Sequence, residues 1–197
     1  MDTLSSSKTK HEHSLIRAFV AVPIAEAAGI ELSHYLNSLK QMASLCWVTP
    51  AQFHITLRFL GEQTQEMIEL VRDALSHVQF SPFEIELSYA GAFPNMRCPR
   101  VLWLSGNQGR RELASLGETV NRSLDEIGLP SERRAFKPHL TLARTNGTPL
   151  PPKLMMELKK PPTLSWRCDS FNLMRSMLTP RGALYSKIPL SGEYDTD

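Results

Sequence analysis

The sequence FHITL at residues 53–57 recurs as PHLTL at residues 138–142, so that the two histidines are 85 positions apart (139 − 54 = 85). Both copies place a histidine, a branched apolar residue, a threonine and a leucine in the same order. A single His-x-Thr match carries little information in a chain with six histidines. Two matches with the same apolar partners indicate two equivalent structural units.

Each copy is predicted to form a β-strand, in which successive side chains point to opposite faces of the sheet. In the first copy, His54 and Thr56 then share one face, whereas Ile55 and Leu57 share the other. The second copy, at residues 138–142, divides in the same way. One face is therefore expected to pack on a hydrophobic core, and the other to present an imidazole beside a hydroxyl.

The two histidines suggest acid–base chemistry. Two similar halves that face each other would bring His54 and His139 together across a cleft. Imidazole titrates near pH 6.5, so one neutral ring can accept a proton while one imidazolium donates a proton. Displacement at phosphorus needs such a pair, together with donors for the charged equatorial oxygens, which the hydroxyls of Thr56 and Thr141 can supply. A phosphodiester is the substrate that fits these groups.

Arg144 follows the second motif and adds a planar guanidinium suited to phosphate. It lies three positions after Thr141, so strict alternation would place it on the opposite face of the strand. A strand end or a β-bulge after Ala143 is needed to turn it towards the site. A surface salt bridge is the alternative role for this arginine.

Other reaction classes lack their motifs in this chain. Neither motif histidine has a carboxylate or cysteine at zinc-ligand spacing, and the three cysteines, Cys46, Cys98 and Cys168, form no C-x-x-C pair. The sequence also contains no phosphate-binding glycine loop, no dinucleotide fingerprint and no serine-hydrolase elbow. We therefore expect no metal and no other cofactor.

The composition is that of an ordinary globular protein, with 197 residues, 42% of them hydrophobic, and a net charge of +2. The charge is too small for a general nucleic-acid coat. No apolar run is long enough for a membrane helix, and the start of the chain lacks the apolar segment of a signal peptide. Free thiols fit a reducing compartment. We expect a cytoplasmic protein with no membrane partner.

The chain is predicted to form one domain. Residues 1–14 are polar and are expected to form a flexible leader, which leaves residues 15–197 for the domain. Helices are predicted at 24–42, from the N-cap Thr64 to about 78, at 110–127 before the C-cap Gly128, and at 154–158. Strands are predicted at 15–22, 46–48, 53–60, 83–93, 101–104, 139–143, 163–174 and 183–190. This interleaving predicts a layered α/β or α+β domain.

The paired motifs resemble those of the RNA 2′,3′-cyclic phosphodiesterases, also called 2′-5′ RNA ligases, of the two-histidine phosphoesterase superfamily. The resemblance extends from about Arg17 to Leu190. It includes RFLG at residues 58–61, GAFP at 91–94, RVLWL at 100–104 and FKP at 136–138.

The resemblance implies an α+β fold, with two pseudo-symmetric lobes of antiparallel sheet and outer helices around a central cleft that carries both motifs. It implies metal-independent hydrolysis of RNA 2′,3′-cyclic phosphate ends to 2′-phosphates. The reverse reaction would join a 2′,3′-cyclic phosphate to a 5′-hydroxyl through a 2′-5′ bond.

The same resemblance implies roles for individual residues. His54 corresponds to the acid that protonates the departing 3′ oxygen, and His139 to the base that activates water. Thr56 and Thr141 match the phosphate-binding threonines, and Arg144 matches the arginine in the family's second motif.

Recognition of the rest of the substrate is less defined. The resemblance also implies that Phe19 stacks on a base. The tryptophans, by contrast, are expected in the core: Trp47, Trp103 and Trp166. Six basic residues either follow an RNA backbone or are ordinary surface charges: Arg97, Arg100, Arg133, Arg134, Lys137 and Arg175.

Two alternatives to an RNA-end hydrolase remain. One is a phosphodiesterase for a small cyclic nucleotide or a 2′-5′ oligonucleotide, and the other is a non-catalytic RNA-binding module. Retention of both complete motifs argues against the binding module. In each case we expect a monomer.

Overall fold

The computed structural model describes residues 15–130, 135–180 and 182–193. The expected leader at 1–14 lies outside the described residues, as do Arg133 and Arg134. The elements follow in the order β1 (Ile16–Pro23), α1 (Glu26–Lys40), β2 (Cys46–Trp47), the 3₁₀ helix η1 (Pro50–Gln52), β3 (His54–Gln63), α2 (Gln65–Ser76), β4 (Phe83–Leu87), β5 (Tyr89–Phe93), β6 (Val101–Ser105), α3 (Arg110–Glu126), β7 (Leu140–Arg144), α4 (Pro152–Glu157), β8 (Leu164–Cys168), β9 (Asn172–Thr179) and β10 (Gly182–Ile188).

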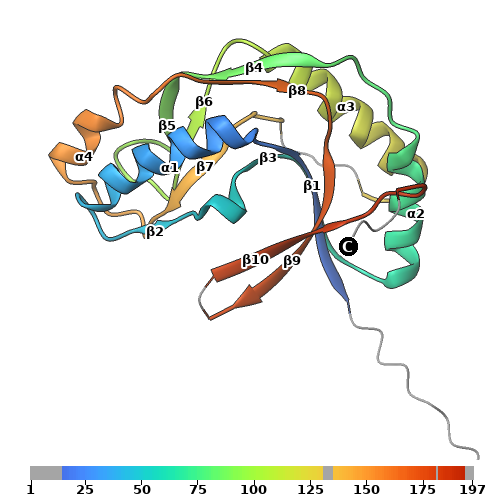
Figure 1. Ribbon diagram of the computed structural model, residues 1–197. Helices are drawn as coiled ribbons and strands as arrows, with labels where there is room; N and C mark the ends of the chain where they lie inside the picture. Colours follow the sequence, from blue (N-terminus) through green and yellow to red (C-terminus); the bar gives the residue numbers. More distant parts are fainter. Residues whose placement is uncertain (1–14, 131–134, 181, 194–197) are drawn as a thin grey trace, which may run out of the picture.

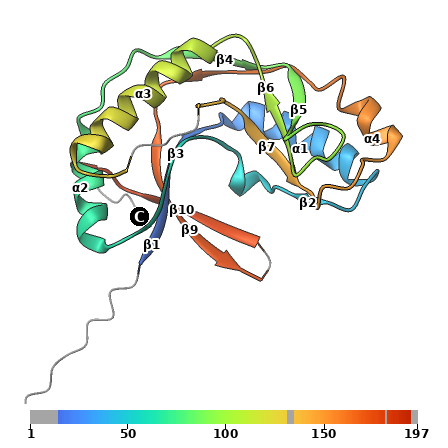
Figure 2. The ribbon, with the colours of Figure 1, turned by 180° about the vertical axis from the view of Figure 1, so that it is seen from behind.

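The described strands form two antiparallel sheets (Figure 1). The large sheet has eight strands in the order β10-β9-β1-β3-β7-β6-β5, with β2 paired to β7. The strands β4 and β8 form a separate two-stranded sheet, and Figure 2 shows them side by side along one edge of the molecule. In the large sheet, β3 and β7 are central neighbours, so the fold brings the two motif strands together.

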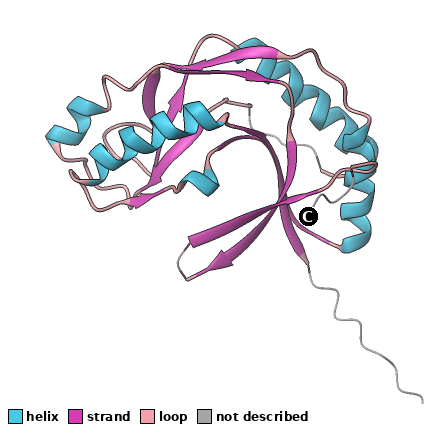
Figure 3. Ribbon diagram, viewed as in Figure 1, coloured by secondary structure: helices cyan, strands magenta, loops and turns pink. Residues whose placement is uncertain are grey.

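The helices cover the outside of this arrangement (Figure 3). Helices α1 and α4 lie beside one half of the large sheet, and α2 and α3 lie beside the other. Each long helix buries a stripe of apolar side chains at a spacing of three and four, as Leu32, Leu36 and Leu39 of α1 do at 1% exposure or less. The expected α+β class, with antiparallel sheets and outer helices, is confirmed.

Two predicted strands are each divided in the structure. The segment predicted as one strand at 83–93 breaks at Ser88 into β4 and β5, and the segment at 163–174 breaks at 169–171 into β8 and β9. At both breaks the chain leaves the small sheet and enters the large one. Alternation along the chain shows that a segment is extended, but it does not show which sheet the segment joins.

Both predicted caps are present at the helix ends. The Thr64 hydroxyl accepts a hydrogen bond from the backbone N–H of Met67 at 3.2 Å and so caps the start of α2. At the end of α3, Gly128 has a φ of +86°, a left-handed conformation that glycine adopts without a steric penalty. Gly128 follows the C-cap residue Ile127.

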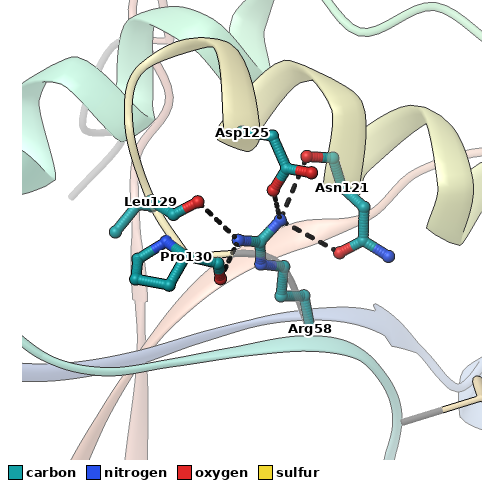
Figure 4. Close-up of polar contacts among 5 residues, drawn as sticks. All are labelled: Arg58, Asn121, Asp125, Leu129 and Pro130. Atoms are coloured by element: carbon teal, nitrogen blue, oxygen red, sulfur yellow. Dashed lines mark hydrogen bonds and ion pairs between the residues drawn. The ribbon is translucent and has the colours of Figure 1, made fainter. Parts of the chain in front are cut away.

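A buried arginine joins the first motif strand to the segment that leads into the second motif. Arg58 of β3 is 3% exposed, and its guanidinium donates to the Asp125 carboxylate at 2.8 Å and to the carbonyl of Asn121 at 3.0 Å (Figure 4). It also donates to the carbonyl oxygens of Leu129 and Pro130, at 3.3 and 2.7 Å. The guanidinium thus supplies donors to backbone carbonyl groups at and just after the carboxyl-terminal end of α3, where positive charge is favourable.

Replacing Arg58 with methionine is expected to lower the free energy of unfolding by about 2–3 kcal/mol. Methionine fills similar space but leaves these buried carbonyl groups without a donor. Denaturant unfolding at pH 7 measures the loss. Lys187→Met is the control, because it removes an exposed ion pair with Glu193, and such pairs contribute less than about 1 kcal/mol. Equal stability of the two variants would contradict the role given to Arg58.

Candidate active site

The register of the two central strands brings the motifs together. Ile55 of β3 pairs with Leu140 of β7 in antiparallel fashion, and both side chains are 0% exposed. In an antiparallel pair the next residue on one strand faces the previous residue on the other. Thr56 therefore lies across from His139, and His54 lies across from Thr141. We call the face of the large sheet that carries these four side chains the site face.

The two histidines are diagonal neighbours on the site face. Diagonal neighbours of an antiparallel pair have Cα atoms about 7–8 Å apart. Electrostatic repulsion from His139 contributes to lowering the pKa of His54, as expected for two groups on one site. Both histidines predicted as catalytic thus belong to one site.

Backbone carbonyls fix the orientation of both imidazole rings. The Nδ1 of His54 donates to the carbonyl of Gln52 at 2.7 Å, and the Nδ1 of His139 donates to the carbonyl of Lys137 at 2.6 Å. A carbonyl can only accept, so Nδ1 carries the proton in each neutral ring. The Nε2 of each ring is left as the atom that exchanges a proton, and that of His54 lies 3.0 Å from the Thr56 hydroxyl.

The pKa of each histidine lies below its ordinary value of 6.5. Burial is the main cause for both rings, because desolvation disfavours the charged imidazolium. The hydrogen bonds to the carbonyls of Gln52 and Lys137 act in the opposite direction, and the positive charge of Arg144 lowers both values further. The site is therefore poised to bind a negatively charged group that would stabilise the imidazolium.

A β-bulge in each motif strand changes the alternation after the threonine. In the pairing of β1 with β3, Thr56 and Arg58 face consecutive residues of β1, so Leu57 is the additional residue. In the pairing of β6 with β7, Thr141 and Ala143 face consecutive residues of β6, so Leu142 is the additional residue. Each motif therefore places two successive side chains on the buried face before it returns to the site face.

The bulge explains how Arg144 reaches the site. Leu142 and Ala143 are both 0% exposed, and Arg144 is the next, exposed residue. Its positive charge is among the causes that lower the pKa of both motif histidines, as expected for a guanidinium near both rings. The bulge thus precedes Ala143 rather than following it. No described carboxylate forms a salt bridge with Arg144, so the alternative role as a surface ion pair is not supported among the described residues.

At the equivalent position of the first motif stands Phe59, which is 60% exposed. The two halves of the site are therefore alike in backbone and different in chemistry, with a cation after one motif and an open aromatic ring after the other.

The structure corrects the role expected of Phe19. This side chain is only 3% exposed, and its ring packs 4.9 Å from the ring centroids of both His54 and Tyr185. A covered ring offers no face to a base, so Phe19 supports the histidine instead. Phe59, 6.3 Å from Phe19, is the accessible ring on this side.

Sequence reasoning missed two positioning residues beside His54. Gln52 holds the Nδ1 of His54 through its backbone carbonyl, and its side-chain amide donates to the carbonyl of Ala183 in β10 at 2.7 Å. Tyr185 of β10 packs edge-on against the His54 ring at 5.4 Å. From the local sequence pattern, the segment of Gln52 is predicted as an ordinary turn and that of Tyr185 as an ordinary strand. Their proximity to the motif arises only from the order of the strands in the sheet.

The expectation for the tryptophans is confirmed for Trp166, which is 6% exposed. It is wrong for Trp103, which is partly exposed, pairs with Thr141 across β6 and β7, and lies 6.4 Å from the His139 ring. The sequence contains a signal for this position: Trp103 alternates with Leu102 and Leu104, which had to occupy the core face, so Trp103 belongs on the opposite face.

A small cavity adjoins the site beside His54. Its lining includes Asn172, Met174 and Tyr185 from the last two strands of the large sheet. Within the described residues, no group of three or more histidine, cysteine, aspartate or glutamate side chains could hold a metal ion. In the same part of the chain, no helix is long and apolar enough to cross a membrane.

Comparisons with known proteins agree with this geometry. Residues 35–178 match the model of the 2′-5′ RNA ligase superfamily. An RNA 2′,3′-cyclic phosphodiesterase of Aeropyrum pernix is 36% identical over 72% of this chain and 82% of its own length. An RNA 2′,3′-cyclic phosphodiesterase of Archaeoglobus fulgidus is 32% identical over 88% of this chain and 98% of its own length.

A solved structure shows the same fold. The crystal structure of TT0787 of Thermus thermophilus superposes with a TM-score of 0.71 at 29% identity, covering 90% of this chain and 100% of the other. The family model, the named relatives and the shared fold point to the same family. The chain belongs to the 2′-5′ RNA ligase superfamily.

Proposed function

We propose that this protein hydrolyses the 2′,3′-cyclic phosphate at the end of an RNA chain to a 2′-phosphate. The relatives in Aeropyrum pernix and Archaeoglobus fulgidus carry the name RNA 2′,3′-cyclic phosphodiesterase, which supports this activity. The observation that carries the proposal is the pair of Nε2 atoms on one site face, each ring held through Nδ1 by a backbone carbonyl.

The chemistry divides between the two rings. The Nε2 of neutral His139 accepts a proton from water as the water oxygen attacks phosphorus. The bond from phosphorus to the 3′ oxygen breaks, and the Nε2–H of protonated His54 donates its proton to that oxygen. The products are a 2′-phosphate and a 3′-hydroxyl, and exchange with solvent restores both rings.

The remaining groups stabilise charge at phosphorus. The hydroxyls of Thr56 and Thr141 donate to the non-bridging oxygens, on which negative charge increases in the transition state. The guanidinium of Arg144 adds a charge-assisted contact of the bidentate type. Phe59 lies on the opposite side of the site and offers a ring for the base of the terminal nucleotide.

A direct assay tests this function. An oligoribonucleotide ending in a 2′,3′-cyclic phosphate is incubated with the protein, and the product is identified as a 2′- or 3′-phosphate by comparison with standards. We expect only the 2′-phosphate, because the proposed mechanism has His54 protonate the departing 3′ oxygen. A 3′-phosphate product would reverse the assignment of the two ester oxygens.

Hydrolysis is expected to continue at an unchanged rate in excess chelator. Proton transfer by two histidines, with charge stabilisation by Thr56, Thr141 and Arg144, supplies each requirement of the reaction without a divalent cation. The assay compares rates with EDTA, without EDTA and after addition of Mg²⁺, Mn²⁺ or Zn²⁺. Loss of activity in EDTA and its recovery with one of these ions would contradict the proposal.

The pH dependence follows from the lowered pKa values. The active form has a protonated His54, and because burial lowers the pKa of this ring below 6.5, the protonated fraction decreases as the pH rises through that lowered value. The alkaline limb of kcat/KM is therefore expected below pH 6.5. Bound phosphate stabilises the imidazolium, so the alkaline limb of kcat should lie at a higher pH.

Both profiles come from initial rates at a series of pH values. The apparent constants belong to the coupled pair rather than to either ring alone. A profile of kcat/KM that is flat from about pH 5 to pH 9 would be inconsistent with acid–base catalysis by two histidines.

Small cyclic nucleotides are the alternative substrates, and a parallel assay with 2′,3′-cyclic mononucleotides tests them.

The described part of the chain has free thiols at Cys46, Cys98 and Cys168, which supports a reducing compartment such as the cytoplasm.

A further inference from the structure

The side chain of Gln52 is bound at both of its polar ends. Its amide oxygen accepts a hydrogen bond from the backbone N–H of Thr49 at 2.9 Å and another from the Thr49 hydroxyl at 3.2 Å. Its amide nitrogen donates to the backbone carbonyl of Ala183 at 2.7 Å. Thr49 precedes η1 and Ala183 belongs to β10. One side chain therefore joins two segments of the chain that are 131 positions apart.

The main chain of the same residue holds the ring of His54. The Gln52 carbonyl accepts the hydrogen bond from the Nδ1 of His54 at 2.7 Å. A shift of Gln52 therefore changes the direction of this ring and of its Nε2, the atom that exchanges a proton. Tyr185 lies two positions after Ala183 in β10, and its ring packs edge-on against that of His54 at 5.4 Å. Strand β10 thus acts on His54 through Gln52 as well as through Tyr185.

Strand pairing gives little support to the outer part of the hairpin that β9 and β10 form. Strand β9 pairs with β1 at residues 172–175, so among the described residues the outer hairpin, residues 176–180 and 182–185, pairs only within itself. Its side chains Met177, Leu178 and Leu184 are 46%, 72% and 57% exposed, and Figure 1 shows the hairpin projecting from the sheet. The hydrogen bond from Gln52 reaches this outer part.

The cavity beside His54 lies between the two joined segments. Its lining includes Ala51 of η1, Tyr185 of β10 and His54 itself. Because a cavity separates part of these two walls, close packing does not fix the distance between them there. The hydrogen bond between Gln52 and Ala183 supplies that restraint.

The ring of His139 is held without the hairpin. Its Nδ1 donates to the carbonyl of Lys137 at 2.6 Å, and the Nζ of Lys137 lies 5.9 Å from the ring centroid of Phe93 in β5. The Phe93 ring packs edge-on against that of His139 at 5.0 Å. Strands β5 and β10 are at opposite ends of the large sheet. The two motif rings therefore depend on different parts of the fold.

We propose, on the basis of the hydrolytic function above, that Gln52 is a positioning residue for the acid alone: it ties the β9–β10 hairpin to η1 and so directs the Nε2–H of His54 towards the 3′ oxygen. This proton passes to the 3′ oxygen as the bond from phosphorus to that oxygen breaks. A misdirected ring slows the departure of the oxygen, whereas activation of water by His139 does not involve Gln52. Loss of the hydrogen bond to Ala183 should therefore slow only reactions whose leaving group needs a proton.

The test compares two leaving groups in the full-length protein. One substrate is an oligoribonucleotide with a 2′,3′-cyclic phosphate, and in the other sulfur replaces the 3′ oxygen and leaves as a thiolate without a proton. Gln52→Glu keeps the oxygen that accepts from Thr49 but loses the donor to Ala183, and Gln52→Met loses both. In each variant kcat with the oxygen substrate is expected to decrease about 10-fold, whereas kcat with the sulfur substrate should stay within about twofold of the wild type.

Rates are compared at the pH optimum of each variant, so that a change in the pKa of His54 caused by the new carboxylate does not affect the comparison. Gln65→Met is the matched control, because the exposed Gln65 amide donates to Glu69 within α2. Both of its rates should equal those of the wild type. Amide hydrogen exchange in the outer hairpin is expected to be faster in both Gln52 variants, because its link to η1 is lost.

The possible results separate this inference from the proposed function. Absence of hydrolysis of the oxygen substrate by the wild type would overturn the proposed function and the role of Gln52 with it. If His54→Ala discriminates between the two substrates and the Gln52 variants do not, only the role of Gln52 is overturned.

Two further results would overturn the link to β10. One is a loss in Gln52→Met without a loss in Gln52→Glu, which would assign the effect to the contact with Thr49. The other is unchanged hydrogen exchange in the outer hairpin. If Gln52→Met does not fold, as judged by its melting transition, the ratio of the two rates in Gln52→Glu decides the matter.

Discussion

His139→Ala and His54→Ala are each expected to lower kcat for hydrolysis of an RNA 2′,3′-cyclic phosphate by about 10²–10⁴-fold, the usual contribution of a positioned acid or base. Each imidazole lies on the site face, whereas the core beneath it is formed by Ile55 and Leu140, which the substitutions do not alter. We therefore expect both variants to fold and to bind the substrate.

Single-turnover rates measured beside the melting temperature distinguish loss of catalysis from loss of structure. His34→Ala is the matched control, because His34 is an exposed residue of α1 outside the site. Its rate should equal that of the wild type. Near-normal turnover in either motif variant would show that the ring concerned does not transfer a proton.

Thr56→Val and Thr141→Val are each expected to lower kcat by about 10²-fold. Valine is nearly isosteric with threonine but removes the hydroxyl that donates to a phosphoryl oxygen, and such donors contribute most when charge develops in the transition state. Binding of an RNA without a cyclic phosphate should change little. Thr119→Val is the control, because the Thr119 hydroxyl lies outside the site and donates to the carbonyl of Ser115 in its own helix, α3.

Arg144 belongs to the same group of phosphate contacts. Arg144→Lys keeps the positive charge but loses the planar pair of donors, so we expect kcat to remain about 10-fold below the wild type. Arg122→Lys on the exposed surface of α3 should have no effect. Unimpaired turnover in Thr56→Val, Thr141→Val and Arg144→Lys together would remove the assignment of these residues to phosphate.

The sequence predicted the two motif strands and the division of their faces because alternation is a local property. It could not place the bulges at Leu57 and Leu142, since an additional residue in a strand is defined only by the neighbouring strand. For this reason the resemblance to a family, rather than alternation, indicated that Arg144 belongs to the site. The structure supplies the physical reason for that indication.

The surroundings of the motifs depend on contacts between distant segments. Tyr185 reaches His54 only because β9 pairs with β1, and this pairing is not encoded in any local pattern. The same hairpin covers Phe19, whose burial the sequence did not predict. The position of Trp103 on the site face could have been predicted from the sequence, because this residue alternates with two leucines, Leu102 and Leu104, that had to be buried.

The measurement that tests the proposed mechanism most directly uses a cyclic substrate in which sulfur replaces the 3′ oxygen. A thiolate leaves without protonation, so the acid becomes unnecessary while the base does not. We expect His54→Ala to hydrolyse this substrate at a rate within about tenfold of the wild type, and His139→Ala to remain about 10²–10⁴-fold slower. An equal loss in His54→Ala on the oxygen and sulfur substrates would contradict its assignment as the acid.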